Sequence, residues 1–113
     1  MTDSCLFCRI ARKGIPATIV FEDESLVAFR DIDAKAPTHV LVIPREHIAS
    51  LNNATDASLL GSLQIAAAKI ARSEGISESG YRTVMNCGAD AGQTVFHVHL
   101  HLLGGRKLGW PPG

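Results

Sequence analysis

The amino-acid sequence predicts a single α+β domain built on a largely antiparallel sheet. Strand-like runs and helical patterns follow one another in the order helix, three strands, helix, two strands. Residues 96–103 alternate between apolar and polar side chains, which is the clearest strand pattern in the chain. With 113 residues the chain can bury one core, so we expect one domain over 1–113.

The first half of the chain is expected to form a short helix and three strands. The helix ends at Gly14, and the acidic turn at Asp23 joins two strands into a hairpin. A loop broken by Pro37 then leads to a β-branched run, which Pro44 stops because proline has no N–H to donate. The expected bounds are Ser4–Lys13 for the helix, Ile19–Glu22, Ser25–Phe29 and His39–Ile43 for the strands, and Asp31–Pro37 for the loop.

The second half is expected to hold a long helix over Thr55–Ser73 and two strands. Thr55 can cap the helix, Asp56 complements its dipole, and Gly75 ends it. Apolar residues at helical spacing give the helix one buried stripe, consisting of Leu59, Leu60, Leu63, Ala67 and Ile70. The remaining segments are the strand Tyr81–Met85, the glycine-containing loop Asn86–Gln93 and the strand Phe96–Leu103.

Composition excludes several classes of protein. Eleven basic and eleven acidic residues cancel, which argues against a nucleic-acid-binding protein with a basic surface. No apolar run approaches the roughly 18–20 residues of a membrane span, and the N-terminus lacks the pattern of a secretory signal. We therefore expect a cytoplasmic protein with no membrane partner, whose three cysteines stay reduced.

Three of the five histidines, His97, His99 and His101, follow one another at alternate positions. In a strand they would share one face at steps of about 6.6 Å. Imidazole titrates near neutral pH, so it can act as base, acid or nucleophile. Because neighbouring positive charges repel, at least one ring should stay neutral and nucleophilic. The residues between them, namely Phe96, Val98, Leu100 and Leu102, are expected to face the core.

The histidine pattern is also compatible with a plain solvent-facing strand or with a metal site. The histidines could form the solvent face of a half-buried strand, although such faces normally carry different polar residues. A His-x-His pair can also hold zinc. Three histidines on one strand span about 13 Å, so a single ion could take one or two of them but not all three.

The segment His97-Val98-His99-Leu100-His101-Leu102-Leu103 resembles the signature of the histidine-triad (HIT) family. The similarity extends over nearly the whole chain, and the C-terminal part resembles the histidine-triad nucleotide-binding, purine nucleoside phosphoramidase branch. The other matching segments are Ile15–Ala17, Phe21–Asp23, Ala36–Pro44, Gly80–Arg82, Leu103–Arg106 and Trp110–Gly113.

The resemblance implies a reaction that proceeds through a covalent intermediate. His99 would attack the α-phosphorus of a nucleoside phosphoramidate, such as an adenosine monophosphoramidate, and water would then hydrolyse the nucleotidyl-histidine. A main-chain group or a neighbour should hold the other ring nitrogen of His99. His101 would donate to the phosphate oxygens, and His97 and His39 would support the site.

The same resemblance implies a binding site for a purine nucleotide such as AMP. Asp31 would bind the ribose hydroxyls, and Phe29, Ile32 and Leu41 would line the base pocket. Asn86, Gly92, Gln93 and Thr94 would lie on the phosphate side with His99 and His101; Thr94 stands where many relatives have serine.

The cysteines at positions 5 and 8 form a CxxC motif. By resemblance to bacterial members of the family, Cys5, Cys8, His47 and His97 are a candidate structural zinc site. The alternatives are a redox dithiol or two buried thiols. A redox motif would more typically accompany a βαβ pattern, which this sequence lacks.

The resemblance also implies a HIT-like fold, with a five-stranded sheet, one long and one short helix, and a homodimer that extends the sheet. A small sheet with exposed edges favours such pairing. The segment Trp110–Gly113 would reach toward the partner's site. Alternative functions are a nucleotide-binding regulatory or partner-binding module, a metal-centred protein and a dinucleoside polyphosphate hydrolase.

Overall fold

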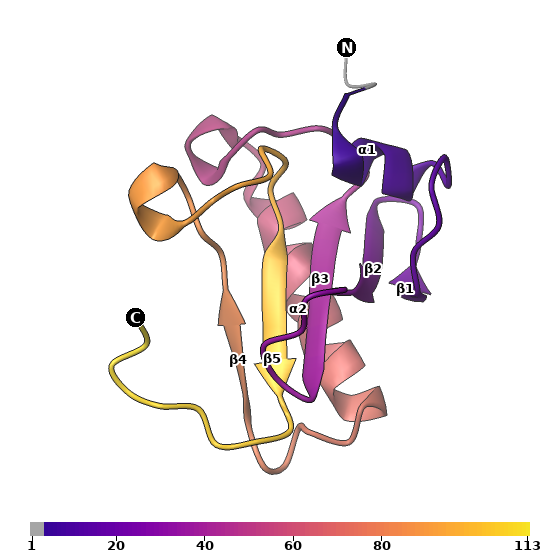
Figure 1. The fold of residues 1–113 in the computed structure, drawn as a ribbon. Coiled ribbons are helices and arrows are strands. Elements are labelled where there is room, and N and C mark those ends of the chain that lie inside the picture. The colour runs from indigo at the N-terminus through magenta and orange to yellow at the C-terminus, as the bar shows by residue number, and fades with distance from the viewer. Residues whose placement is uncertain (1–3) are drawn as a thin grey trace.

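The computed structural model describes residues 4–113, and its elements follow the predicted order (Figure 1). A short helix is followed by three strands, a long helix and two strands, with two single turns of 3-10 helix between them. The bounds are α1 (Leu6–Ala11), β1 (Ile19–Glu22), β2 (Leu26–Arg30), β3 (Thr38–Pro44), η1 (Leu51–Asn53), α2 (Ala57–Ser73), β4 (Tyr81–Val84), η2 (Ala89–Ala91) and β5 (Leu100–Gly104).

The five strands form one sheet in the order β1-β2-β3-β5-β4, and every neighbouring pair is antiparallel. The predicted hairpin is present as β1 and β2, with a register shift between Ile19 and Phe21. The centre of the sheet pairs β3 with β5, so that Leu41 lies opposite His101 and His39 opposite Leu103. The α+β class and the antiparallel sheet are thus confirmed.

The two faces of the sheet have separate cores. Helix α2 covers one face, as Figure 1 shows, where its residues Leu63, Ala67 and Ile70 pack against alternate residues of β3 and β5. On the other face, α1 packs on the remaining residues of the strands, including Phe29 and Leu41. Because side chains alternate along a strand, His39 and His101 share the α1 face, on which the candidate site lies.

Helix α2 begins at Ala57, two residues after the predicted bound, and its N-cap lies one residue after the predicted one. Asp56, rather than Thr55, is its N-cap, and the Asp56 carboxylate accepts from the main-chain N–H groups of Ser58 and Leu59. Gly75 ends the helix as predicted, with a φ of 76° that suits a residue without Cβ.

The last strand is shorter than predicted, because β5 begins at Leu100 rather than Phe96. Pro44 has no N–H to extend the ladder, and its carbonyl accepts from the His97 ring at 2.8 Å. The Val98 N–H instead donates to the carbonyl of Ile48. Val98, Leu100 and Leu102 are buried as expected, whereas the expectation for Phe96 was wrong, since it is 54% exposed.

Helix α1 is also shorter than the predicted span Ser4–Lys13. Cys5 is its N-cap, and the Cys5 thiol accepts from the Cys8 N–H at 3.4 Å. Among the helices of residues 4–113, none combines the length and apolar character needed to span a bilayer.

Candidate functional site

A cavity of about 520 Å³ opens between α1, the loop after β2, and the centre of the sheet. This volume is typical of sites for small molecules. Seven of the predicted nucleotide-binding residues line it, namely Phe29, Asp31, Ile32, Leu41, Thr94, His99 and His101. Three of the four predicted catalytic histidines line it too: His39, His99 and His101.

The tautomer of His99 is fixed by the main-chain carbonyl of His97. The His99 ring is buried, and its Nδ1–H donates to the carbonyl oxygen of His97 at 2.7 Å. A neutral imidazole carries one proton, so Nε2 of His99 keeps its lone pair. His99 therefore offers a nucleophilic nitrogen in a residue that lines the cavity.

A second chain of hydrogen bonds fixes the tautomers of His39 and His101. The Lys35 N–H donates to Nδ1 of His39 at 3.0 Å, so the proton of neutral His39 is on Nε2. That proton points to Nδ1 of His101, 2.9 Å away. Since Nδ1 of His101 accepts, its Nε2 carries a proton and is a hydrogen-bond donor.

Burial keeps these rings uncharged. The pKa of His101 is lowered to about 4. The main cause is burial, and the neighbouring rings of His99 and His39 lower it further. The pKa of His39 is also lowered by burial, and the nearby Asp31 carboxylate only partly opposes this. At neutral pH, His101 therefore acts as a neutral donor from Nε2, as the hydrogen-bond pattern requires.

Asp31 joins the histidines to the loop that borders the cavity. One of its oxygens lies 3.4 Å from Nε2 of His39, and the other accepts from the Asp33 N–H at 2.8 Å. The carboxylate is thus held beside the His39–His101 pair while it lines the cavity. A carboxylate in this position can accept from the hydroxyls of a bound sugar.

The loop residues that the sequence predicts for the phosphate side divide into two groups. Thr94 lines the cavity, whereas Asn86, Gly92 and Gln93 are not among its lining residues. The buried Gln93 side chain holds the loop instead, since it accepts from the Gly88 N–H and donates to the Ala49 carbonyl. Ile32 lies at the rim of the cavity and is fully exposed.

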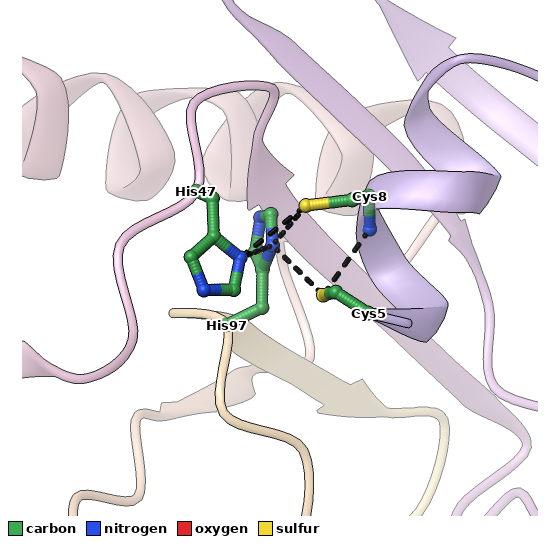
Figure 2. A group of neighbouring side chains, drawn as sticks. All are labelled: Cys5, Cys8, His47 and His97. Atoms are coloured by element: carbon green, nitrogen blue, oxygen red, sulfur yellow. Dashed lines mark hydrogen bonds between the residues drawn. The ribbon is translucent and has the colours of Figure 1, made fainter. Parts of the chain in front are cut away.

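The two cysteines of the CxxC motif lie beside two histidines from distant parts of the chain (Figure 2). Nδ1 of His97 is 3.4 Å from both Sγ atoms, 3.3 Å separates Nδ1 of His47 from Sγ of Cys8, and the two Nδ1 atoms are 3.3 Å apart. The four ligand atoms lie within 4.8 Å of one another.

This cluster has the dimensions of a metal site. A tetrahedral zinc ion with ordinary bond lengths would separate two nitrogens by about 3.3 Å, and a nitrogen and a sulfur by about 3.6 Å. The Nε2–H of His97 donates to the Pro44 carbonyl, which leaves the Nδ1 lone pair toward the cluster. The four predicted ligands are therefore gathered, oriented and able to hold a metal ion.

The sequence reasoning missed one wall of the cavity, which α1 provides through Leu6, Phe7 and Ile10. The Phe7 ring packs edge-on against His99, with centroids 5.1 Å apart, and against Phe29 at 5.4 Å. Leu6 and Phe7 lie between the two cysteines of the CxxC motif, and Ile10 lies two residues after it, so the motif already indicated that this segment belongs to a site.

Comparison with known proteins gives consistent results. The HIT domain model matches residues 12–108. A purine nucleoside phosphoramidase from Escherichia coli strain K12 is 48% identical over 96% of this chain and 93% of its own length. An uncharacterized HIT-like protein from Synechococcus elongatus is 52% identical over the whole of both chains. The crystal structure of a HIT family hydrolase from Legionella pneumophila matches with a TM-score of 0.94 and 56% identity, over 96% of this chain and 99% of that chain.

Proposed function

The chain belongs to the HIT family, and from that premise we propose that it hydrolyses the phosphorus–nitrogen bond of purine nucleoside phosphoramidates. The relative from Escherichia coli is a purine nucleoside phosphoramidase, and the two chains align over nearly their full lengths, which supports this reaction class. An adenosine monophosphoramidate is the substrate that we propose for testing, and AMP would be its nucleotide product.

The observation that carries the proposal is the pair of complementary imidazoles at the cavity. His99 keeps a lone pair on Nε2, and His101 keeps a proton on Nε2, while the ring centroids are 5.0 Å apart. One ring can thus attack phosphorus while the other donates to a phosphate oxygen. Stabilising charge that develops in the transition state is usually the largest single contribution to catalysis.

The proposed reaction has two displacements. Nε2 of His99 forms a bond to phosphorus as the substrate's phosphorus–nitrogen bond breaks, and the leaving amine takes up a proton from solvent. Water then attacks phosphorus and gives up a proton to solvent, and the bond to His99 breaks to release the nucleoside monophosphate. Dividing one displacement into two easier ones is the usual advantage of covalent catalysis.

The remaining residues of the site are assigned supporting roles. We propose that Asp31 binds the ribose, that Phe29, Ile32 and Leu41 contact the base, and that Thr94 lies near the phosphate. His39 positions His101 through their hydrogen bond. Asn86, Gly92 and Gln93 are proposed to act on the phosphate side through the loop, in which Gln93 holds the main chain in place.

We further propose that the ion for which Cys5, Cys8, His47 and His97 are suited is zinc, in a structural role. Two sulfurs and two imidazole nitrogens at tetrahedral spacing are the donor set that zinc prefers. Cysteine ligation requires reduced thiols, and Cys5, Cys8 and Cys87 form no disulfide in the structure. This requirement supports a cytoplasmic location, where thiols stay reduced.

A homodimer is the proposed assembly. Strand β4 lies at the edge of the sheet, where a second copy could pair with it. Gln64 of α2 accepts a hydrogen bond from Thr83 of β4, so helix and strand together would form the interface. The C-terminal segment runs beside β4 (Figure 1), with Arg82 over the ring of the exposed Trp110.

Turnover of an adenosine phosphoramidate by the purified protein tests the proposed function. We expect wild type to release the amine, and His99→Asn to bind AMP with similar affinity but to release no amine. Tight AMP binding without turnover of any phosphoramidate by wild type would instead indicate a nucleotide-binding module.

A further inference from the structure

Helix α1 contributes residues both to the Cys/His cluster and to the wall of the cavity. Its N-cap Cys5 and its residue Cys8 are members of the Cys/His cluster, while Leu6, Phe7 and Ile10 form a wall of the cavity. The helix has six residues, far below the length at which an isolated helix is stable in water. Its position must therefore come from contacts with the rest of the protein, and the cluster supplies two of them through the cysteine side chains.

One route from α1 to the nucleophile is the packing of the Phe7 ring against the ring of His99. Phe7 is buried and touches the rings of His99 and Phe29 edge-on, at centroid distances of 5.1 and 5.4 Å. A displacement of α1 would open the apolar wall of the cavity and remove the ring that packs against His99. Because protein interiors are close-packed, a displacement of α1 would also shift the side chains that it contacts.

A second route leads from the cluster to the nucleophile through His97. The ring of His97 places Nδ1 in the cluster and donates from Nε2 to Pro44, so both of its nitrogens are engaged. The carbonyl of the same residue accepts from Nδ1 of His99 at 2.7 Å. The group that sets the tautomer of His99 therefore belongs to a residue of the cluster.

From these two routes we propose that metal binding at Cys5, Cys8, His47 and His97 is coupled to nucleotide binding in the cavity. With the four ligands joined, α1 is fixed against the sheet, and Phe7 and the His97 carbonyl are positioned for the bound nucleotide. Without the ion, α1 loses that constraint and the cavity loses a wall. Phe7 and His97 are thus positioning residues, and the coupling rests on the proposed metal site and nucleotide binding.

Coupling of this kind is reciprocal. Whatever factor the metal contributes to nucleotide affinity, the nucleotide must contribute to metal affinity. Coupling between two sites commonly amounts to a factor of about 5 to 150. A metal that only raised the stability of the whole fold would leave the AMP affinity of the folded protein unchanged.

The test compares the full chain stripped by a chelator with the same protein reloaded with one equivalent of zinc. Isothermal titration measures the Kd of AMP in both forms and the Kd of zinc with and without AMP. Amide hydrogen exchange reports on α1 at Arg9 and Arg12, whose N–H groups donate to the carbonyls of Cys5 and Cys8. The exchange rates of Val40 and Val42 in β3 serve as the reference. Cys5→Ser/Cys8→Ser removes the cluster's sulfurs, and Cys87→Ser is the matched control.

We expect stripping to raise the AMP Kd by about 5-fold or more, zinc to restore it, and AMP to tighten zinc binding by the same factor. Exchange should accelerate at Arg9 and Arg12 but not in β3. The double variant should resemble stripped protein with or without zinc, and Cys87→Ser should behave as wild type.

Three results would overturn the proposal: no zinc binding, an AMP Kd that zinc does not change, or equal loss of protection in α1 and β3. Failure of the zinc-loaded protein to bind AMP would contradict the proposed nucleotide site instead. The exchange measurement needs no nucleotide, so it would still decide whether the metal fixes α1.

Discussion

The Nδ1–H of His99 donates to the carbonyl oxygen of His97, two residues earlier in the chain, at 2.7 Å. This contact assigns the lone pair of His99 to Nε2 without help from any distant side chain. The orientation of the His99 ring therefore depends on the main chain of His97. A change at either residue should alter the position of Nε2 of His99.

His101→Ala removes the proposed donor to phosphate. We expect kcat to fall by about 10²–10³, the usual scale for the loss of one such donor. AMP binding should change less, because base and ribose contacts are made elsewhere. Steady-state rates on an adenosine phosphoramidate measure the effect, and an unchanged kcat would exclude His101 from the reaction.

The buried histidines make stability depend on pH. His101 has a folded pKa of about 4, below the value of about 6.5 expected in the unfolded chain. Between these values the unfolded state binds more protons, so the free energy of unfolding rises with pH from about 4 to 6.5. In His101→Asn, the number of protons taken up on unfolding in this pH range should fall by up to about one per chain, so the slope of the unfolding free energy against pH should be smaller. Urea unfolding with chelator present gives the slopes, and identical slopes would contradict the assignment.

Cys8→Ala removes one proposed metal ligand. Wild type should carry about one zinc per chain by elemental analysis, and the variant should lose most of it. Because structural zinc contributes directly to folding, Tm should fall by at least about 4 °C, the shift expected for roughly 1 kcal/mol in a domain of this size. Cys87→Ala should retain both zinc and Tm. Stoichiometric zinc in a Cys5→Ala/Cys8→Ala variant would refute the ligand set.

The proposed homodimer is tested by light scattering at micromolar concentration, where twice the chain mass is expected. Tyr81→Asp places a charge on the edge strand β4, at a side chain that is partly exposed in one chain. This change should shift the protein toward monomer, and the same substitution at the exposed Ile32 should not. A monomeric wild type would rule the dimer out.

Local patterns in the sequence were enough to predict the fold. Alternation predicted the strands, helical spacing predicted α2, and Gly75 predicted where it ends. The errors arose where two residues were equally suited or where pairing was non-local. Thr55 and Asp56 can both cap a helix, and only the structure shows that the Asp56 carboxylate reaches the two free N–H groups. The start of β5 depends on Pro44, which lies on another strand.

The site was predictable in its residues but not in its geometry. Alternation placed His97, His99 and His101 on one face of one strand, whereas only His101 lies in β5. His97 and His99 precede that strand, and His97 turns its ring to the Cys/His cluster. The hydrogen bond between His39 and His101 joins residues 62 positions apart, and no local sequence pattern predicts such a contact. Phe7 was missed because an apolar residue in a short helix looks like ordinary core.

The most direct test of the proposed reaction is to trap the covalent intermediate. Wild type is mixed with an adenosine phosphoramidate, quenched within milliseconds and analysed by intact-mass spectrometry and peptide mapping. We predict a mass increase of one adenylyl group on the peptide that contains His99, and none in His99→Asn. Hydrolysis by wild type without an adduct, together with near-normal activity of His99→Asn, would contradict the assignment of His99 as the nucleophile.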